Sequence, residues 1–254
     1  MITVTIVGTG NVAQVLFQAL NANKEVEVRQ VVGRSREKLA PFDGQVPVTT
    51  NYQELISADV HILAVSDNAI ATVAKNMPPE AGLVVHTSGA TPLSALENLD
   101  RSGVFYPLQT FTKGILPDLG IIPICVEARY GEDEALLLSL ASTISGTVRK
   151  VTSAERKILH LCAVFVNNFT NYMYIIGTDI CEAHGLDAAL LQPLIQETAR
   201  KTGLMDPKWA QTGPARRGDQ QTMHAHLDLL QKEEHKQLYI IMSNAIKKHY
   251  GEKL

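Results

Sequence analysis

The 254-residue sequence has only three cysteines, nearly balanced charge and no long apolar run, and each shortage argues against a class of protein. Cys125, Cys162 and Cys181 form no C-x-x-C pair, which argues against a zinc cluster or disulfide scaffold and indicates buried thiols in a reducing compartment. Twenty-three Lys and Arg against 26 Asp and Glu create no basic field for nucleic acid or anionic lipid. No segment approaches the ~18 apolar residues of a membrane span, and the N-terminus lacks a cationic signal region. We therefore expect a globular, cytoplasmic protein that binds neither nucleic acid nor membranes.

Up to about residue 150, short Val- and Ile-rich runs alternate with helix-like stretches. This alternation is typical of a parallel sheet with helices on both faces. We predict helices between most neighbouring strands, for example at 11–20 and 132–144, because parallel pairing needs a long crossover connection. The predicted strands are 3–7, 26–32, 60–65, 82–86, 104–106, 121–126 and 147–151.

The pattern changes at Thr152. The segment "TSAE" predicts a capping box between Thr152 and Glu155, followed by a long helix that ends near Gly185. Pro193 predicts a kink or break in the next stretch, since proline costs roughly 3 kcal/mol inside a helix. Helical stretches are predicted at 187–202, 219–231 and 233–249. The expected fold is therefore α/β, with a doubly wound parallel sheet in a first domain, 1–151, and an all-α second domain, 152–254.

The segment "VGTGNVA" (7–13) joins the first predicted strand to the first helix with the spacing G-x-G-x-x-A. The first glycine permits a tight turn, the second lets the backbone approach a pyrophosphate, and the free amides of the helix start face the anion. This arrangement is the phosphate-binding turn of a Rossmann dinucleotide domain, although such a glycine pair can also be only structural. The turn residues expected to bind the cofactor are Gly8, Thr9, Gly10, Asn11 and Val12.

The end of the second strand, "VVGRSREK", indicates which dinucleotide is bound. An NAD site usually carries an acidic residue there for the ribose 2′-hydroxyl, but this chain has Arg34, Ser35 and Arg36. Cationic and hydroxyl donors suit a 2′-phosphate, and one charge-assisted hydrogen bond is worth roughly 1.5–3 kcal/mol. The prediction is NADP, with a solvated loop as the alternative account of these residues.

Polar side chains also follow the next strands at the carboxyl edge of the sheet, where open α/β sheets bind ligands. In "LAVSDNAI", Val65, Ser66 and Asp67 are expected beside the nicotinamide half of the cofactor, although Asp67 could instead cap a helix. In "VVHTSGAT", His86 and Ser88 are candidate catalytic residues, and Ser88 could hold a substrate carboxylate or hydroxyl.

Taken together, these segments resemble a superfamily that joins an NADP-binding Rossmann domain to an all-helical domain. It includes β-hydroxyacid dehydrogenases, 6-phosphogluconate dehydrogenase, pyrroline-5-carboxylate reductase and deazaflavin-dependent NADP oxidoreductases. The chain is most similar to a bacterial group, labelled NADP oxidoreductases, whose helical domain has no known function. The resemblance implies the fold, NADP as cofactor and a homodimer formed through the helical domain, but no substrate. Its motifs here are "VGTGNVA", "VVGRS", "AVSD", "HTSG", "YPLQTF", "LHLCAVFVNNF" and "TGPARRGD".

The chain departs from β-hydroxyacid dehydrogenases in the residues that carry their chemistry. In those enzymes a lysine on the long helix acts as acid and base, and an asparagine follows it one helical turn later. In this chain, which resembles them in its overall pattern, Lys157 is followed four positions later by Leu161. The long helix offers His160 instead, which suits proton transfer near neutral pH. It also offers Asn168 as the catalytic candidate that contacts substrate or nicotinamide, because a buried amide needs a partner. A core histidine and a helix-packing amide are the competing accounts.

The remaining candidates concern the substrate. Tyr106 and Gln109 in "YPLQTF" are expected to form a pocket wall, and Arg217 in "TGPARRGD" could neutralise an acidic substrate or lie in water. His224 and His226 stand two apart on a predicted helix and face different directions, so we expect no metal site.

The leading hypothesis is an NADP(H)-dependent oxidoreductase. It would transfer hydride to or from a small substrate in a cleft between the Rossmann domain and the long helix. A flavin or deazaflavin could replace the organic substrate. The alternative hypothesis is an NADP(H)-binding redox sensor without turnover. The missing Lys/Asn pair favours it, whereas the polar cluster of His86, Ser88, His160 and Asn168 argues against it. A third hypothesis is a structural dimer with a vestigial Rossmann domain.

Overall fold

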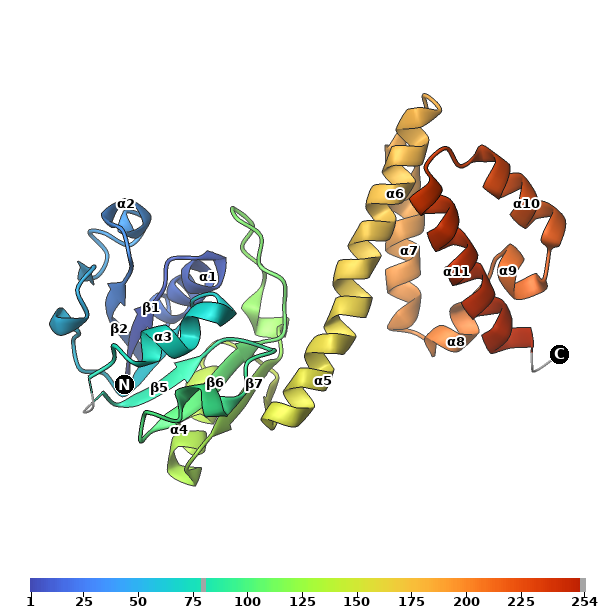
Figure 1. The fold of residues 1–254 in the computed structure, drawn as a ribbon. Coiled ribbons are helices and arrows are strands. Elements are labelled where there is room, and N and C mark those ends of the chain that lie inside the picture. The colour runs from blue at the N-terminus through green and yellow to red at the C-terminus, as the bar shows by residue number, and fades with distance from the viewer. Residues whose placement is uncertain (79–80, 252–254) are drawn as a thin grey trace. The chain divides into compact units, whose positions relative to one another are not determined.

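A computed structural model describes residues 1–78 and 81–251 (Figure 1). By packing, the chain divides into two compact units, Met1–Asn167 and Asn168–Leu254. The change from sheet to helix falls at Thr152, where the sequence places its domain boundary, but the first helix after that point packs with the first unit.

The first unit contains an eight-stranded sheet with the order β3-β2-β1-β4-β5-β6-β7-β8. From β1 the chain adds β2 and β3 on one side and then β4 to β8 on the other. The position between β1 and β4 is therefore a topological switch point, where open α/β sheets bind ligands at the carboxyl ends of the strands. The strands are β1 (Ile2–Val7), β2 (Val26–Val32), β3 (Val48–Thr49), β4 (Val60–Leu63), β5 (Leu83–His86), β6 (Ser102–Pro107), β7 (Ile124–Ala128) and β8 (Val148–Lys150).

The predicted α/β fold with its Rossmann-type sheet is confirmed, with two corrections. β7 runs antiparallel to β6, whereas every other neighbouring pair is parallel. The connection from β6 to β7 contains only the 3₁₀ turn Leu119–Ile121 and no crossover helix, which parallel pairing requires. The two-residue strand β3 was not predicted, because it is too short to show alternation.

Helices cover both faces of the sheet. On one face, α1 (Asn11–Asn21) and α4 (Gly131–Ser142) pack buried leucines and Phe17 against the strands. On the other, α3 (Ile70–Ala74) covers β4 and β5, and α5 (Ser153–Ala163) brings Leu159 to the buried side chains of β6 and β7. A short helix, α2 (Arg36–Leu39), follows β2.

The long helix begins and ends as the sequence predicts. The Thr152 hydroxyl accepts from the Glu155 amide, and the Glu155 carboxylate accepts from the Thr152 amide, so the capping box is confirmed. α5 continues through a π-helical turn, Val164–Phe169, into α6 (Thr170–Ala183), and Gly185 ends the helix with φ +68°. The π-helical turn widens the helix locally, which the sequence did not predict.

The second unit is helical. A 3₁₀ turn, Ala188–Leu191, precedes α7 (Gln192–Thr202), so Pro193 lies in the first turn and the predicted break is confirmed. The other helices are α8 (Pro207–Ala210), α9 (Pro214–Arg217), α10 (Gln220–Leu229) and α11 (Glu233–Gly251). In residues 1–78 and 81–251, none of the helices combines the length and apolar character needed to cross a bilayer.

Candidate functional site

The glycine-rich turn after β1 has two glycines with different surroundings. Gly8 has φ +134°, and a Cβ there would collide with the carbonyl oxygen of Ala64. Gly10 has ordinary dihedral angles, and a Cβ on it would meet no atom within 4 Å in the described structure. Gly8 is therefore required by the fold, whereas the space beside Gly10 is open to a ligand.

The turn leads directly into the N-terminus of α1. Gly10 is the N-cap, and within the described residues no side chain caps the helix. The first intrahelical bond runs from the Gln14 amide to the Gly10 carbonyl. The amides before Gln14 in the first turn therefore have no acceptor within the helix. Such a helix start favours an anion through its free N–H groups and its dipole. The predicted phosphate cradle thus has the required backbone.

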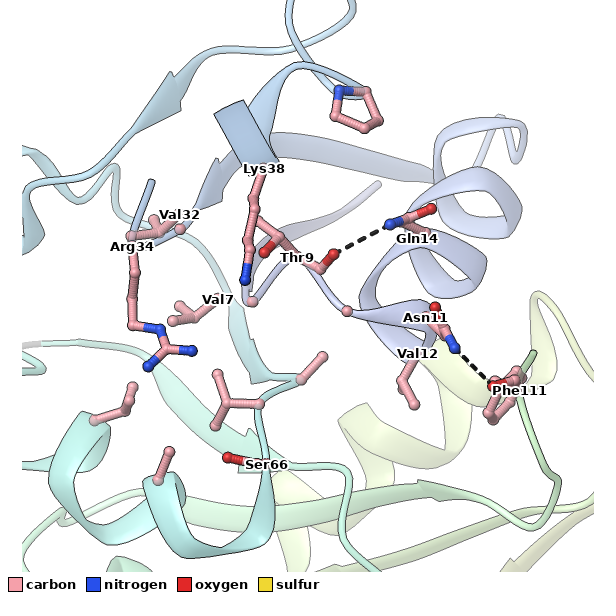
Figure 2. A pocket seen from close by; sticks show the side chains of 18 of the residues that line it. Val7, Thr9, Asn11, Val12, Gln14, Val32, Arg34, Lys38, Ser66 and Phe111 are labelled. Atoms are coloured by element: carbon pink, nitrogen blue, oxygen red, sulfur yellow. Dashed lines mark hydrogen bonds between the residues drawn. The ribbon is translucent and has the colours of Figure 1, made fainter. Parts of the chain in front are cut away.

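Side chains fix this turn in place (Figure 2). The Asn11 side-chain amide donates to the Phe111 carbonyl at 2.9 Å, and the Gln14 side-chain amide donates to the Thr9 carbonyl at 3.1 Å. The first bond ties the segment after β6 to the start of α1. Asn11 therefore shapes the site as well as lining it.

A cavity of about 1020 Å³ opens over the turn, large enough for a dinucleotide. Eight of the eleven predicted cofactor residues line it: Gly8, Thr9, Gly10, Asn11, Val12, Arg34, Val65 and Ser66. Its wall also includes residues that the sequence analysis did not name, among them Lys38, Tyr52, Phe111 and Lys113.

Two cations enter this cavity from the segment after β2. Figure 2 shows the exposed side chains of Arg34 and Lys38 extending into it. Burial raises the pKa of Tyr52 in the same wall, and the charge of Arg34 partly opposes this shift. Lys38 was missed, although it follows Arg34 by four residues in "RSREK", because its approach to the cavity depends on the turn of α2.

Three predicted cofactor residues lie outside the cavity lining: Ser35, Arg36 and Asp67. Ser35 and Arg36 start α2 instead. Asp67 is the first residue of a 3₁₀ turn whose N-cap is Ser66, so the alternative role of Asp67 as a helix cap is wrong.

A second polar group lies where β5 and β6 meet α5. The Tyr106 hydroxyl is 3.5 Å from Nδ1 of His160, and the two rings meet edge to face. A Cβ on Gly89 would lie 2.7 Å from Tyr106 and 2.8 Å from His160 Nδ1. The structure therefore brings together two predicted residues, Tyr106 and His160, around a glycine that leaves them room.

His86 and Ser88 lie at the end of β5 and in the loop that follows it. His86 is fully buried, its Nδ1 accepts from the Ser88 amide, and its Nε2 has no partner in the described structure. Burial, with a smaller contribution from the Arg156 charge, lowers the pKa of His86 to about 4. The Ser88 hydroxyl accepts from the amides of Ala90 and Thr91, which shapes the loop after β5.

Other predicted residues are placed as follows. Gln109 is exposed and lines the cavity, as a wall residue should. Asn168 is exposed, so the premise that its amide is buried is wrong, and its catalytic assignment stays a prediction. Arg217 ends α9 and is exposed. Cys162 is also exposed, contrary to the expectation of buried thiols.

The paired histidines of α10 have separate partners. His224 contacts the Gln220 carbonyl and His226 contacts the Tyr239 hydroxyl, each at 2.8 Å. Among residues 1–78 and 81–251, no three His, Cys, Asp or Glu side chains gather as metal ligands.

The sheet, its switch point and the cavity over the glycine-rich turn define a Rossmann-type dinucleotide-binding protein. A family model described as NADP oxidoreductase, coenzyme F420-dependent, matches residues 3–88, and one for a domain of unknown function, DUF2520, matches residues 122–246. A crystal structure from Bacteroides fragilis, provisionally named as an NADP oxidoreductase, has 36% sequence identity and a TM-score of 0.88, over 97% of this chain and 98% of that one. The chain therefore belongs to the NADP oxidoreductase family that carries the DUF2520 domain.

More distant structures share the fold. A reductive aminase from Aspergillus terreus, in complex with NADPH and ethyl levulinate, has 16% identity and a TM-score of 0.70, over 99% of this chain and 95% of that one. A pyrroline-5-carboxylate reductase from Coxiella burnetii has 20% identity and a TM-score of 0.58, over 99% and 98%. A search of curated proteins found no significant match. Family membership confirms the predicted class, an oxidoreductase, and the predicted cofactor, NADP.

Proposed function

We propose that the protein transfers hydride between NADP(H) and a small carbonyl, imine or hydroxy compound. The observation that carries this proposal is the cavity that combines an uncapped helix start, the open space beside Gly10 and two cations. The amides of α1 would hold the pyrophosphate. Arg34 and Lys38 would hold the 2′-phosphate, because guanidinium and ammonium groups both form charge-assisted bonds to phosphate. NADP supplies the hydride-carrying nicotinamide when it is bound.

The chain's own contribution to the chemistry is a proton at the Tyr106–His160 pair. Burial raises the pKa of Tyr106, so its hydroxyl keeps a proton at neutral pH and can donate it. His160 Nδ1 is within reach of that hydroxyl and can replace the proton. The charge of Asp67 also raises the pKa of Tyr106, which indicates that the end of β4 and this pair share one region of the first unit.

Five predicted residues have smaller parts in this proposal. His86 has no exposed surface, and the Ser88 hydroxyl already accepts two amides, so we assign both to the support of the loop that carries Gly89. Gln109 stays a substrate-binding candidate at the cavity wall. Asn168 and Arg217 stay candidates from the second unit.

The test is NADPH oxidation with a panel of acceptors: a cyclic imine, a cyclic ketone, a flavin and a deazaflavin. For the best acceptor, Tyr106→Phe and His160→Gln should each lower kcat at least about 100-fold, the usual contribution of proton transfer, with NADPH affinity unchanged within about twofold. Full activity in both variants would contradict the proton assignment. NADPH binding without turnover of any acceptor would favour a redox sensor.

We also propose that the second unit forms a homodimer. Its helices expose apolar side chains that a monomer rarely presents to water, including Leu190 (74%), Leu194 (64%) and Ile241 (63%). A second copy of the same helices is the occupant that the family resemblance implies. Sedimentation equilibrium tests this, and a monomer at micromolar concentration would contradict it.

A further inference from the structure

Arg156 is an ionisable side chain in an unusual place. It lies in α5, one helical turn before His160, and only 1% of its surface is exposed. Its Nη1 pairs with the Glu127 carboxylate at 2.5 Å, and its Nη2 donates to the Thr91 carbonyl at 2.7 Å. One side chain therefore connects α5 to the end of β7 and to the loop after β5.

Glu127 and Ser153 complete the connection. The Glu127 carboxylate accepts from the Ser153 amide at 2.9 Å and from the Ser153 hydroxyl at 2.7 Å. The same hydroxyl accepts from the Leu93 amide at 2.9 Å. We call Glu127, Ser153 and Arg156 the α5 clamp. It joins three segments of the first unit that are far apart in the sequence.

The loop held by the clamp is the loop that carries Gly89. Thr91 and Leu93, which bond to the clamp, follow Gly89 by two and four residues. Gly89 lies so close to Tyr106 and His160 that even a methyl group would collide with both. A small shift of α5 against this loop would therefore change the distance between the Tyr106 hydroxyl and His160.

Stability is a weak explanation for the clamp. A buried ion pair can often be replaced by apolar side chains without loss of stability, because the desolvation of two charges offsets their attraction. Within the described structure, Arg156 also leaves its Nε buried without a hydrogen-bond partner, which is unfavourable. The clamp instead fixes the orientation of α5 relative to β7 and the loop after β5, since the guanidinium fork binds two acceptors at once.

We propose that Arg156 and Glu127 are positioning residues, which fix α5 so that His160 is held against Tyr106. This inference rests on the proposed proton role of that pair. It assigns a role to two residues that do not line the cavity over the glycine-rich turn.

The experiment is histidine-labelled NMR on the full-length protein, with the His160 ring signals assigned through His160→Gln. Arg156→Lys keeps the charge but loses the fork, and Glu127→Gln keeps the shape but loses the charge. Each should shift the His160 ring signals, lower kcat at least about tenfold with the best acceptor, and leave NADPH affinity unchanged within about twofold. The matched control is Arg101→Lys, which likewise keeps the charge but loses the guanidinium fork of the pair that Arg101 forms with buried Asp133 elsewhere in the first unit.

Unchanged His160 signals in Arg156→Lys and Glu127→Gln would overturn the proposal. The same would follow if Arg101→Lys moved the signals equally, because the effect would then be general loosening. If both clamp variants fail to fold, Ser153→Ala decides, since it removes clamp bonds without unpairing a charge: a His160 shift supports the proposal, and no shift overturns it. The NMR readout needs no turnover, so an absence of NADPH binding would refute the proposed function separately.

Discussion

The two compact units differ in how they bury side chains. The first unit packs its strands against helices on both faces, with fully buried residues such as Ile6, Leu16 and Ile62. In the described part of the second unit, only Ala215, Met223 and His235 are buried. One unit thus has the hydrophobic core of an independent domain, whereas the other presents its apolar surface to its surroundings. A site that needs fixed geometry is therefore expected in the first unit and an association surface in the second.

The largest expected effect is a loss of stability in acid that originates in the first unit. Burial lowers the pKa of both His61 and His86 to about 4. The unfolded chain, with histidine pKa values near 6.5, binds these protons first, so stability is full above about pH 6.5 and falls as the pH drops toward 4. At pH 5 each histidine should lower the free energy of unfolding by roughly 2 kcal/mol.

Urea unfolding at pH 7 and pH 5 measures this loss. His61→Leu should remove about half of this loss of stability, because it removes one of the two buried histidines that take up a proton on unfolding. Leucine suits the position, since both ring nitrogens of His61 are buried without partners in the described structure. The control is His224→Leu, on the exposed surface of the second unit. If His61→Leu and His224→Leu changed the acid loss of stability equally, the loss would not originate in the buried histidines of the first unit.

A second prediction separates the two glycines of the phosphate-binding turn. Gly8→Ala should lower the free energy of unfolding by about 3 kcal/mol, because the methyl group meets the Ala64 carbonyl in a backbone conformation that alanine disfavours. Gly10→Ala should leave stability nearly unchanged but weaken NADPH binding at least about tenfold, since the methyl group fills the open space over the turn. Calorimetry and urea unfolding of both variants check this. Equal losses of stability would contradict it.

The third prediction concerns the second unit. Ile241→Lys should weaken self-association at least about tenfold, because a charge in an apolar interface costs more than the roughly 1.4 kcal/mol that this factor represents. Ile241→Leu is the matched control and should associate normally. Sedimentation equilibrium distinguishes them. An unchanged association constant in Ile241→Lys would place Ile241 outside the interface.

The sequence predicted features that depend on local chemistry. The glycine-rich turn, the Thr152–Glu155 capping box and the break at Pro193 each follow from a few neighbouring residues, and each is confirmed. The direction of β7 was wrong, because it depends on how the chain returns after β6 and not on the strand's own residues.

The candidate site was predicted only in part, because some of its residues follow from local sequence and others depend on tertiary packing. Arg34 was found through its position after β2, but Lys38 was missed because its approach to the cavity depends on the turn of α2. Arg156 and Glu127 were missed because no sequence pattern distinguishes a buried ion pair from exposed charges on a helix and a strand. His86 was predicted at the right edge of the sheet, yet its full burial follows from tertiary packing.

The most direct test of the account is a parallel calorimetric titration with NADPH and NADH. The cavity with Arg34 and Lys38 predicts that NADPH binds at least about tenfold more tightly, and that Arg34→Ala and Lys38→Ala each reduce this preference, with a larger loss in the double variant. Arg36→Ala, outside the cavity lining, should keep it. Equal binding of the two nucleotides, or a preference that survives in the double variant, would contradict the claim that this cavity recognises NADP through these cations.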